Sequence, residues 1–430
     1  GTPASPVPHH PMNAFQLRNG QLHAEDVSLA QIAARFGTPC YVYSRGAITE
    51  AWREFAQACA GRRVLVCYAL KANSNLAIID LLAREQAGFD IVSAGELARV
   101  LAAGCSAERI VFSGVGKSGE EIREALRAGV RCFNVESSAE LERLDRIAGE
   151  LGRRAPVSLR VNPNVDAGTH PYISTGLREN KFGIPHEDAL DTYLQAARLP
   201  HLEVIGIDCH IGSQITSLAP FTAALDKVLE LVDRLHEHGV PLHHIDLGGG
   251  LGIRYDDETP PSRAALLNAV FERLDRHPRG AQYEILFEFG RSIVGNAGVL
   301  LTQVEYLKRN GERNFAIVDA GMNDLMRPAL YEAWHGVQAV SPRQGEAQAF
   351  DIVGPVCESG DWLARARRLC LAEGDLLAVM SAGAYGMAMS SNYNTRPRAA
   401  EVLVDGSHVH LIRARETIES LFALEHRLPG

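Results

Sequence analysis

The stretch YALKAN, residues 68–73, ends an apolar run with a single lysine, Lys71. Residues 64–70 have the apolar composition of a buried strand, which places Lys71 just past its predicted carboxyl end. Residues 73–75 then supply helix-capping side chains, and we expect a helix to begin near Leu76. A lysine at the end of a buried strand is partly desolvated by that strand and can still reach a cleft, which is the setting in which an amine loses its proton and forms Schiff bases. A solvated lysine in a turn is the alternative.

The chain that follows alternates between short apolar runs and amphipathic stretches of helical period. The predicted strands cover residues 64–70, 89–92, 110–112, 132–135, 157–161, 204–209, 245–247 and 285–289. The helices predicted between them cover residues 77–85, 95–103, 120–128, 139–151, 187–198, 221–238 and 264–274. Eight strands that alternate with helices predict an α/β protein with a (β/α)8 TIM barrel, although a doubly wound sheet has the same alternation.

Polar residues stand at the carboxyl ends of the predicted strands, the edge at which a barrel of this kind gathers its chemistry. They are Lys71, Asp90, Ser113, Glu136, Arg160, His210, residues 248–250 (all glycine) and Glu288. A turn or a helix cap would explain any single one of them equally well. The complete set indicates an active site at that edge.

After Arg291 the sequence changes to alternating apolar and polar residues, at 299–307, 315–319, 349–353 and 376–380. Asp405 and Gly406 join two further alternating runs, 401–404 and 408–413, which is a strong hairpin signal. This half is therefore predicted to be a mostly antiparallel β domain. The expected division is a leader or expression remnant at 1–11, a segment joining the β domain at 12–40, the barrel at 41–290 and the β domain at 291–430.

The composition is that of an ordinary globular protein, with 46% hydrophobic and 22% charged residues in a chain of 430. A net charge of −9 without long charged blocks argues against binding to nucleic acid or to anionic membranes. No apolar run reaches the roughly 20 residues that span a bilayer, so a cytoplasmic location is expected. Neither the eight cysteines nor the histidines between residues 236 and 244 have metal-ligand spacing, and no metal site is predicted.

Several of these polar residues predict the binding of an anionic, aromatic cofactor. Residues 248–250 would present backbone N–H groups to a phosphate, unless they only make a turn. His210 is suited to lie against an aromatic ring or to transfer protons, or it is a histidine satisfied by backbone. Glu288 and Arg291 flank Gly290, where they form a simple ion pair or serve a protonated ring nitrogen and an anionic group.

This combination resembles the pyridoxal-phosphate decarboxylases of the alanine-racemase-like fold type, and within that group the diaminopimelate decarboxylases. The resemblance runs from Tyr41 to Phe422. It rests on the stretches 68–73, 90–97, 160–163, 170–183, 210–214, 246–252, 288–291, 327–331, 357–358 and 384–386. Phe289 departs from it, because the family usually has proline there, and loss of the proline is expected to loosen the segment that aims Glu288 and Arg291.

The resemblance implies pyridoxal 5'-phosphate as cofactor, held covalently by Lys71 with His210 stacked on its ring. The other implied cofactor ligands are Asp90, Arg160, Ser213, Gly248, Gly249, Gly250, Glu288, Gly290, Arg291 and Tyr385. Cys357 is implied to be the proton donor, and to come with Glu358 from the second subunit of a homodimer that shares its active sites. The implied substrate ligands are Arg291, Arg327, Tyr331, Glu358 and Tyr385.

The implied reaction is the decarboxylation of meso-2,6-diaminopimelate to L-lysine and CO2, the last step of lysine biosynthesis. The distal carboxylate of this substrate would match Arg291 and Arg327, and its distal amine would match Glu358. An ornithine or arginine decarboxylase of the same fold is the runner-up, but its substrate would leave both arginines unmatched. A non-catalytic regulatory homologue is a further alternative, although its expected sign, loss of Lys71 or Cys357, is not found.

Overall fold

The computed structural model describes residues 13–168 and 180–430. The expected leader, residues 1–11, lies outside the described residues, and so do residues 170–179 of the stretch 170–183 that carries part of the resemblance. Within the described part, no helix is both long enough and apolar enough to cross a membrane.

Eight parallel strands close into a barrel, with every neighbouring pair hydrogen-bonded and the last strand returning to the first. They are β5 (Val64–Ala69), β6 (Gly88–Ile91), β7 (Ile110–Phe112), β8 (Cys132–Val135), β9 (Ala155–Asn162), β11 (Leu202–Asp208), β12 (His244–Asp246) and β13 (Glu284–Phe289). The strands follow the barrel in chain order, and the short β10 (Ile184–Pro185) adds to β9. The predicted barrel is therefore confirmed, and a doubly wound sheet is excluded.

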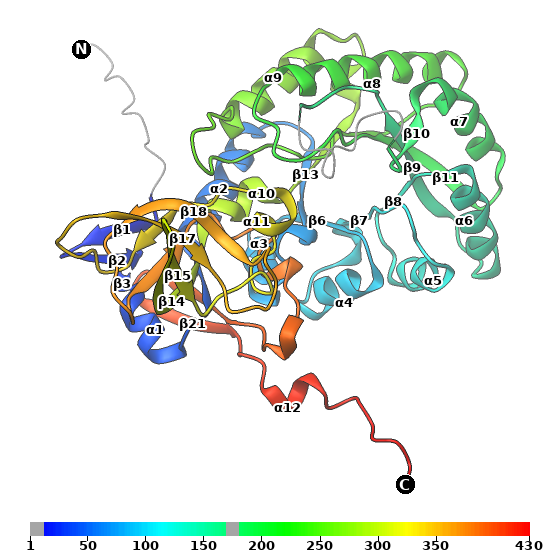
Figure 1. Ribbon diagram of the computed structural model, residues 1–430. Coiled ribbons are helices and arrows are strands. Elements are labelled where there is room, and N and C mark those ends of the chain that lie inside the picture. Colours follow the sequence, from blue (N-terminus) through cyan, green and yellow to red (C-terminus); the bar gives the residue numbers. More distant parts are fainter. Residues whose placement is uncertain (1–12, 169–179) are drawn as a thin grey trace, which may run out of the picture.

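Helices surround the barrel and form the arc on the right of Figure 1. They are α3 (Leu76–Arg84), α4 (Ala94–Ala102), α5 (Gly119–Ala128), α6 (Ser138–Glu150), α7 (Ala189–Arg198), α8 (Ala219–Glu237) and α9 (Arg263–Arg276). Most of these helices begin after a capping residue whose side-chain oxygen accepts a hydrogen bond from a backbone N–H of the first turn. The capping residues are Asn75, Ser93, Ser118, Ser137 and Ser262. The sequence did not predict α2 (Arg45–Ala58), which packs between α9 and α3 and so completes the ring.

The inside of the barrel has an apolar layer below a polar one. Leu286, Cys132 and Val111 belong to a small buried cluster between the strands. Residues two apart on a strand face the same side, so Glu288, Asn134 and Ser113 extend the same faces toward the carboxyl ends. The alternation of each strand therefore brings polar groups together at the barrel mouth.

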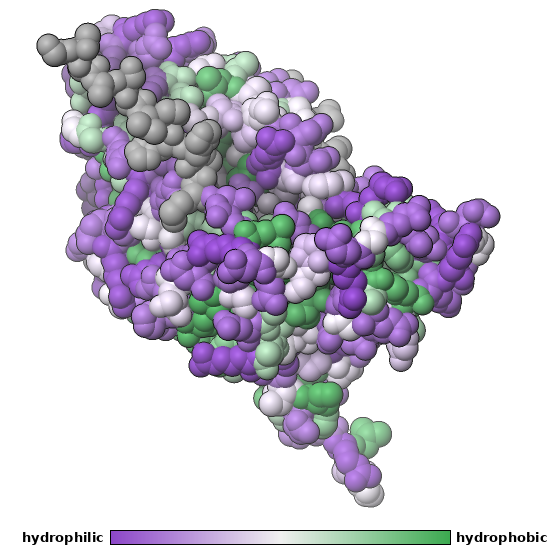
Figure 2. Space-filling view, turned by 90° about the vertical axis from the view of Figure 1, so that its left-hand side faces the viewer, coloured by the Kyte–Doolittle hydropathy of each residue, from purple (hydrophilic) through white to green (hydrophobic). Residues whose placement is uncertain are grey.

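The second half forms a mostly antiparallel sheet, as predicted, which lies on the left of Figure 1. Its order is β18-β17-β15-β14-β4-β20-β21, with β16 and β19 attached beside β14. The bounds are β14 (Gly298–Asn310), β15 (Arg313–Val318), β16 (Val337–Ala339), β17 (Gln348–Val353), β18 (Trp362–Leu369), β19 (Leu376–Val379), β20 (Ala400–Asp405) and β21 (His408–Arg413). The sequence did not predict β16 or β18. The face drawn in Figure 2 is largely hydrophilic, with hydrophobic residues in several separate groups.

Strand β4 (Cys40–Ser44) differs from the expected division. It lies almost wholly within the range expected for the barrel, yet it pairs with β14 and β20 of the second sheet. All five of its residues are buried, as a central strand requires. The amino-terminal strands β1 (Phe15–Arg18), β2 (Gln21–Ala24) and β3 (Val27–Ser28) form a small sheet that shares a hydrophobic core with β4 and β14.

Candidate active site at the barrel mouth

Lys71 stands where the sequence places it, in a single 3-10 turn, Leu70–Ala72, directly after β5. Leu70 and Ala72 are buried, whereas Lys71 is exposed. Gly290 packs tightly on this turn, because a Cβ added to it would lie 3.0 Å from the Cβ of Ala72. The residues on both sides of Lys71 are thus packed in the protein, whereas the Lys71 side chain is exposed.

Lys71 acts electrostatically on three titratable groups at the barrel mouth, Asp90 of β6, Glu288 of β13 and His210 after β11. Burial raises the pKa of Asp90 and of Glu288, and the charge of Lys71 opposes both shifts. Burial also lowers the pKa of His210 well below its ordinary value, and the charge of Lys71 adds to that shift. The amine therefore lies close enough to all three to act on their protonation.

His210 lies beyond the end of β11 with its tautomer set by the backbone. Its Nδ1 accepts the N–H of Gly249 at 3.2 Å, so Nδ1 carries a lone pair and the proton of the neutral ring sits on Nε2. The ring is half-buried. His210 is therefore a neutral imidazole at the barrel mouth.

The glycines at 248–250 form a turn in which the backbone of three strands comes together. A Cβ on Gly249 would lie 2.1 Å from the carbonyl oxygen of Glu288, and one on Gly250 would lie 2.4 Å from that of Gly212. Gly248 and Gly250 also have φ of +67° and +95°, which favours glycine. The turn therefore admits no side chain.

The turn presents fewer N–H groups than the sequence suggests. The N–H of Gly248 donates to Asp246 Oδ1 at 2.9 Å, and that of Gly249 donates to His210. Only Gly250, of these three, has an N–H without a partner among the described residues. A buried turn must satisfy its own donors, and the N–H groups of Gly248 and Gly249 do so within the protein. Phosphate binding by residues 248–250 stays a prediction.

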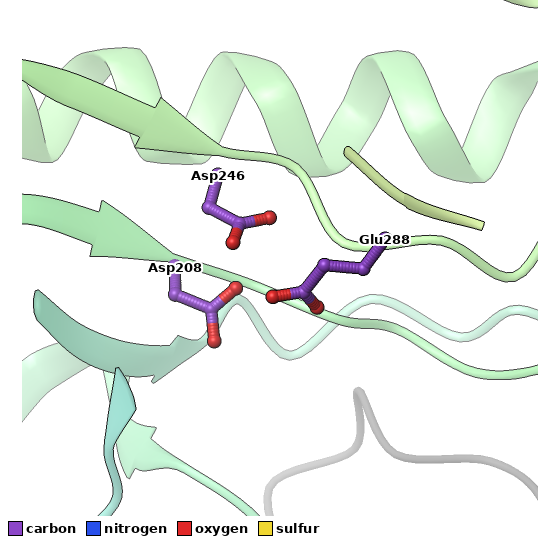
Figure 3. Close-up of side chains that lie close together, drawn as sticks. All are labelled: Asp208, Asp246 and Glu288. Atoms are coloured by element: carbon purple, nitrogen blue, oxygen red, sulfur yellow. The ribbon is translucent and has the colours of Figure 1, made fainter. Parts of the chain in front are cut away.

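Three carboxyl groups meet at the centre of the barrel, from Asp208, Asp246 and Glu288 (Figure 3). All three are buried, with oxygen atoms within 4.8 Å of one another. Burial raises the pKa of each well above its ordinary value, and the neighbouring carboxylates raise it further. Like charges this close cannot all be ionised, so the cluster holds protons.

Glu288 is held in place by a chain of neutral donors. Asn134 Nδ2 donates to Glu288 Oε1 at 3.1 Å and to Ser113 Oγ at 3.1 Å. Ser113 in turn donates to Asp90 Oδ1 at 2.7 Å. Asp90 and Glu288 are therefore linked through Ser113 and Asn134, in a network that involves the ends of four strands, β6, β7, β8 and β13.

Arg160 and Glu136 form a buried ion pair at the ends of β9 and β8. Arg160 Nη1 lies 3.4 Å from Glu136 Oε1, and the guanidinium faces the ring of Phe182 at 4.9 Å. Arg160 Nη2 is buried without a hydrogen-bond partner among the described residues. This nitrogen is a donor available to a bound group.

Two more buried guanidinium groups, of Arg291 and Arg327, lie close to Tyr255. Arg291 donates to the Tyr255 hydroxyl and, at 2.8 Å, to Ser213 Oγ, and its guanidinium lies 4.5 Å from the ring centroid of Tyr385. Arg327 faces the Tyr255 ring at 4.4 Å. Within the described residues neither arginine pairs with a carboxylate, and the Nε of each is buried without a partner.

The remaining predicted residues divide into two groups. Tyr331 ends the short helix α11 (Arg327–Tyr331) and acts electrostatically on both arginines, so it belongs with them. Cys357 and Glu358 are instead exposed on a loop of the β domain. Among the described residues, the hydrogen bonds of residues 357–360 involve this loop and Asn394, and none of them joins Cys357 to Lys71.

Known proteins resemble this chain along almost its whole length. The family described as pyridoxal-dependent decarboxylase, pyridoxal binding domain, matches residues 45–295. A diaminopimelate decarboxylase of Pseudomonas fluorescens is 63% identical to the chain over 97% of this chain and 100% of that protein.

The chain belongs to the diaminopimelate decarboxylase family. The resemblance read from its motifs is thereby confirmed.

Solved structures of this family have the same fold along nearly the whole chain. Diaminopimelate decarboxylase of Helicobacter pylori, complexed with L-lysine, is 44% identical with a TM-score of 0.88, over 92% of this chain and 98% of that one. The enzyme of M. jannaschii, also in complex with L-lysine, is 38% identical with a TM-score of 0.92, over 97% and 98%.

The sequence missed four residues of the site in this member of the diaminopimelate decarboxylase family. Asp208 and Asp246 could have been predicted from the sequence, because each is a carboxylate in an apolar strand and aspartate is rarely buried without a partner. Tyr255 and His335 had none. They lie in loops far apart in the sequence, and only the fold brings both to Arg327.

Proposed function

We propose that this chain uses pyridoxal 5'-phosphate to decarboxylate meso-2,6-diaminopimelate, giving L-lysine and CO2 as the last step of lysine biosynthesis. The observation that carries the substrate assignment is the pair of buried, carboxylate-free guanidinium groups of Arg291 and Arg327. A buried cation is costly unless an anion compensates it. A substrate with a distal carboxylate supplies that anion.

The residues at the barrel mouth fit the cofactor. Lys71 offers an exposed amine, and the glycine turn at 248–250 leaves no room for a Cβ. The N–H of Gly250 and the hydroxyl of Ser213, which accepts from Arg291, are suited to bind a phosphate. Glu288 offers a buried carboxyl group whose raised pKa favours the protonated form. An aldehyde, a phosphate and a basic ring nitrogen therefore each have a suitable partner.

When bound, pyridoxal phosphate supplies an aldehyde for the amine and an electron-poor ring that takes up the electron pair left by CO2. Lys71 would hold the cofactor. His210 would lie against the ring without adding charge, because burial keeps its imidazole neutral. Glu288 would keep the ring nitrogen protonated, with the carboxyl groups of Asp208 and Asp246 behind it. Asp90, Arg160, Gly248, Gly249, Gly290 and Tyr385 would complete the cofactor's surroundings.

Arg291, Arg327 and Tyr331 would bind the distal carboxylate and so fix which end of the substrate reacts. Both guanidinium groups are held by neutral partners, so their charge is available to the ligand. A substrate without this carboxylate would leave two buried cations unpaired, which disfavours ornithine and arginine.

Cys357 would return a proton to the reacting carbon, and Glu358 would bind the distal amine, both from the second copy of a homodimer. Support comes from the exposure of this loop, which on one chain leaves the thiol and the carboxylate facing outward. Each site would then be complete only when two copies associate.

The test is to measure CO2 release from meso-diaminopimelate, L-ornithine and L-arginine, each with and without added pyridoxal phosphate. We expect release from meso-diaminopimelate alone, and only with the cofactor. Release from ornithine or arginine in its place would overturn the substrate assignment, and release from none of them would refute the activity.

A further inference from the structure

His335 is a buried histidine that is hydrogen-bonded to Arg327, one of the residues predicted for the site. It follows α11 and has no exposed surface. Its Nδ1 lies 2.9 Å from the carbonyl oxygen of Met380, and its Nε2 lies 2.9 Å from Arg327 Nη1. A carbonyl only accepts, so Nδ1 carries the proton, and Nε2 is left with a lone pair that accepts from the guanidinium.

The imidazole is therefore neutral while it holds Arg327. Burial and, next, the neighbouring charge of Arg327 together lower the pKa of His335 to about 3. A carboxylate in the same place would bond the guanidinium equally well but would cancel its charge. A neutral acceptor fixes the direction of Arg327 and leaves its full positive charge to an external anion.

Neighbouring residues hold the imidazole ring and the backbone of His335 in place. Tyr255 packs its ring edge-on against the imidazole, with centroids 5.3 Å apart, while the same ring lies under Arg327. Arg367 of β18 donates to the backbone carbonyl of His335 at 2.6 Å and stacks on Trp334. The acceptor is thus anchored by Met380, Tyr255 and Arg367, from three separate segments of the chain.

We propose that His335 is a positioning residue for substrate specificity, which orients Arg327 toward the distal carboxylate without neutralising it. The proposal rests on the proposed function, in which Arg327 binds that carboxylate. Because His335 acts on the site through its hydrogen bond with Arg327, its loss is expected to affect recognition of one end of the ligand. Ligands that lack the distal carboxylate are the direct probe of this difference.

The experiment compares the dissociation constants of L-lysine, which keeps the distal carboxylate, and of cadaverine, which lacks it. Binding to the holoenzyme is followed by the absorbance of the bound cofactor. In His335→Phe we expect L-lysine to bind about 10- to 100-fold more weakly, the range for losing a hydrogen bond to a charged group, with cadaverine unchanged. His335→Gln, which retains one donor and one acceptor, should restore most of the preference.

Two further variants separate positioning from general damage. In an Arg327→Gln background, His335→Phe should change the ratio of the two constants no further, because the residues act as one unit. His244→Phe replaces another buried histidine, on β12, and should leave the ratio unchanged. Thermal unfolding of every variant checks that it folds.

The outcomes distinguish the inference from the proposed function. A wild-type enzyme that does not prefer L-lysine to cadaverine refutes a distal-carboxylate site altogether. A wild-type preference that survives in His335→Phe overturns only the role of His335. Equal weakening of both ligands, or additive effects with Arg327→Gln, also overturns it.

Discussion

The backbone N–H of Tyr385 donates a hydrogen bond of 2.8 Å to the carbonyl oxygen of Ala72, the residue after Lys71. Asn73 reinforces the contact, because its Nδ2 donates to Gly383 O at 3.1 Å. A loop of the β domain is therefore bonded directly to the lysine turn of the barrel. The candidate site belongs to both halves of the chain.

Replacement of Lys71 by alanine should abolish cofactor attachment and turnover. Borohydride reduction of the wild-type holoenzyme should fix the cofactor to the peptide that contains Lys71, because this exposed amine lies beside Asp90, His210 and Glu288. Peptide mapping measures the site of attachment. Lys308→Ala, at the exposed end of β14, is the control and should label normally. A label on any other lysine would refute the assignment.

Replacement of Cys357 by alanine should lower turnover by about 10²- to 10⁴-fold, the usual cost of losing a positioned acid, with the cofactor still bound. Cys370→Ala, a partly buried thiol elsewhere in the β domain, is the matched control. Mixing the inactive Lys71→Ala and Cys357→Ala proteins should restore about one quarter of the sites, since half of randomly assembled dimers are hybrids with one complete site. No recovery on mixing would contradict the shared site.

Replacement of Gly249 by alanine should destabilise the protein by about 1–3 kcal/mol and weaken cofactor binding. The added Cβ would lie 2.1 Å from the backbone oxygen of Glu288, so two strand ends must move apart. Gly116→Ala is the control, because nothing lies within 4 Å of its added Cβ. Denaturant unfolding and cofactor titration measure the two effects, and equal behaviour of both variants would exclude the close approach.

Replacement of Asp246 by asparagine should flatten the pH dependence of apoenzyme stability. Burial and the neighbouring Asp208 raise the pKa of Asp246, so the folded state binds more protons than the unfolded one above about pH 4. Stability then falls as pH rises from the ordinary carboxyl value through the raised folded pKa. Asparagine has no proton to lose, and it should remove at most about 1.4 kcal/mol per pH unit from this slope.

Unfolding free energies of wild type and Asp246→Asn, measured from about pH 5 to about pH 9, test this difference. Asp226 is exposed on α8, and Asp226→Asn is the control that should follow the wild-type slope. Parallel slopes for Asp246→Asn and wild type would show that Asp246 titrates normally.

Replacement of Phe289 by proline should destabilise the protein, although proline is the residue that the family usually has there. The Phe289 ring is buried and stacks on Phe55 of α2, with centroids 4.1 Å apart and planes at 7°. Removing a buried phenylalanine costs about 3–5 kcal/mol, which exceeds the gain of about 0.4–1 kcal/mol from a stiffer backbone. Chemical denaturation checks this, with exposed Phe422→Ala as control, and an unchanged midpoint would contradict it.

The packing of Phe289 also bears on the expected loosening of its segment. Besides Phe55, the ring stacks on Phe287 at 5.3 Å, and the residue pairs with Tyr68 in the barrel. Side-chain packing here supplies the restraint that a proline ring supplies through the backbone. The sequence did not indicate this, because α2, which carries Phe55, was not predicted.

Much of the site could be predicted because parallel strands bring their carboxyl ends to one edge. Lys71, Asp90 and Glu288 follow from that rule alone once the alternation of strands and helices is recognised. Residues 248–250 were predicted to present N–H groups to a phosphate or to make a turn, but their hydrogen bonds were not predicted, since Asp246 and His210 accept two of these N–H groups only in the folded chain. The resemblance, and not the alternation, supplied Cys357 and Glu358.

The sequence by itself determined the barrel, the antiparallel domain and the placement of Lys71, because hydrophobic period and capping residues are local properties of the chain. Only the tertiary structure decided how charge is distributed in the site. Burial raises the pKa values of Asp208, Asp246 and Glu288 together, and burial is set by segments far apart in sequence. The neutral support of Arg327 by His335 likewise exists only in the folded protein, because a hydrogen bond depends on distance in space.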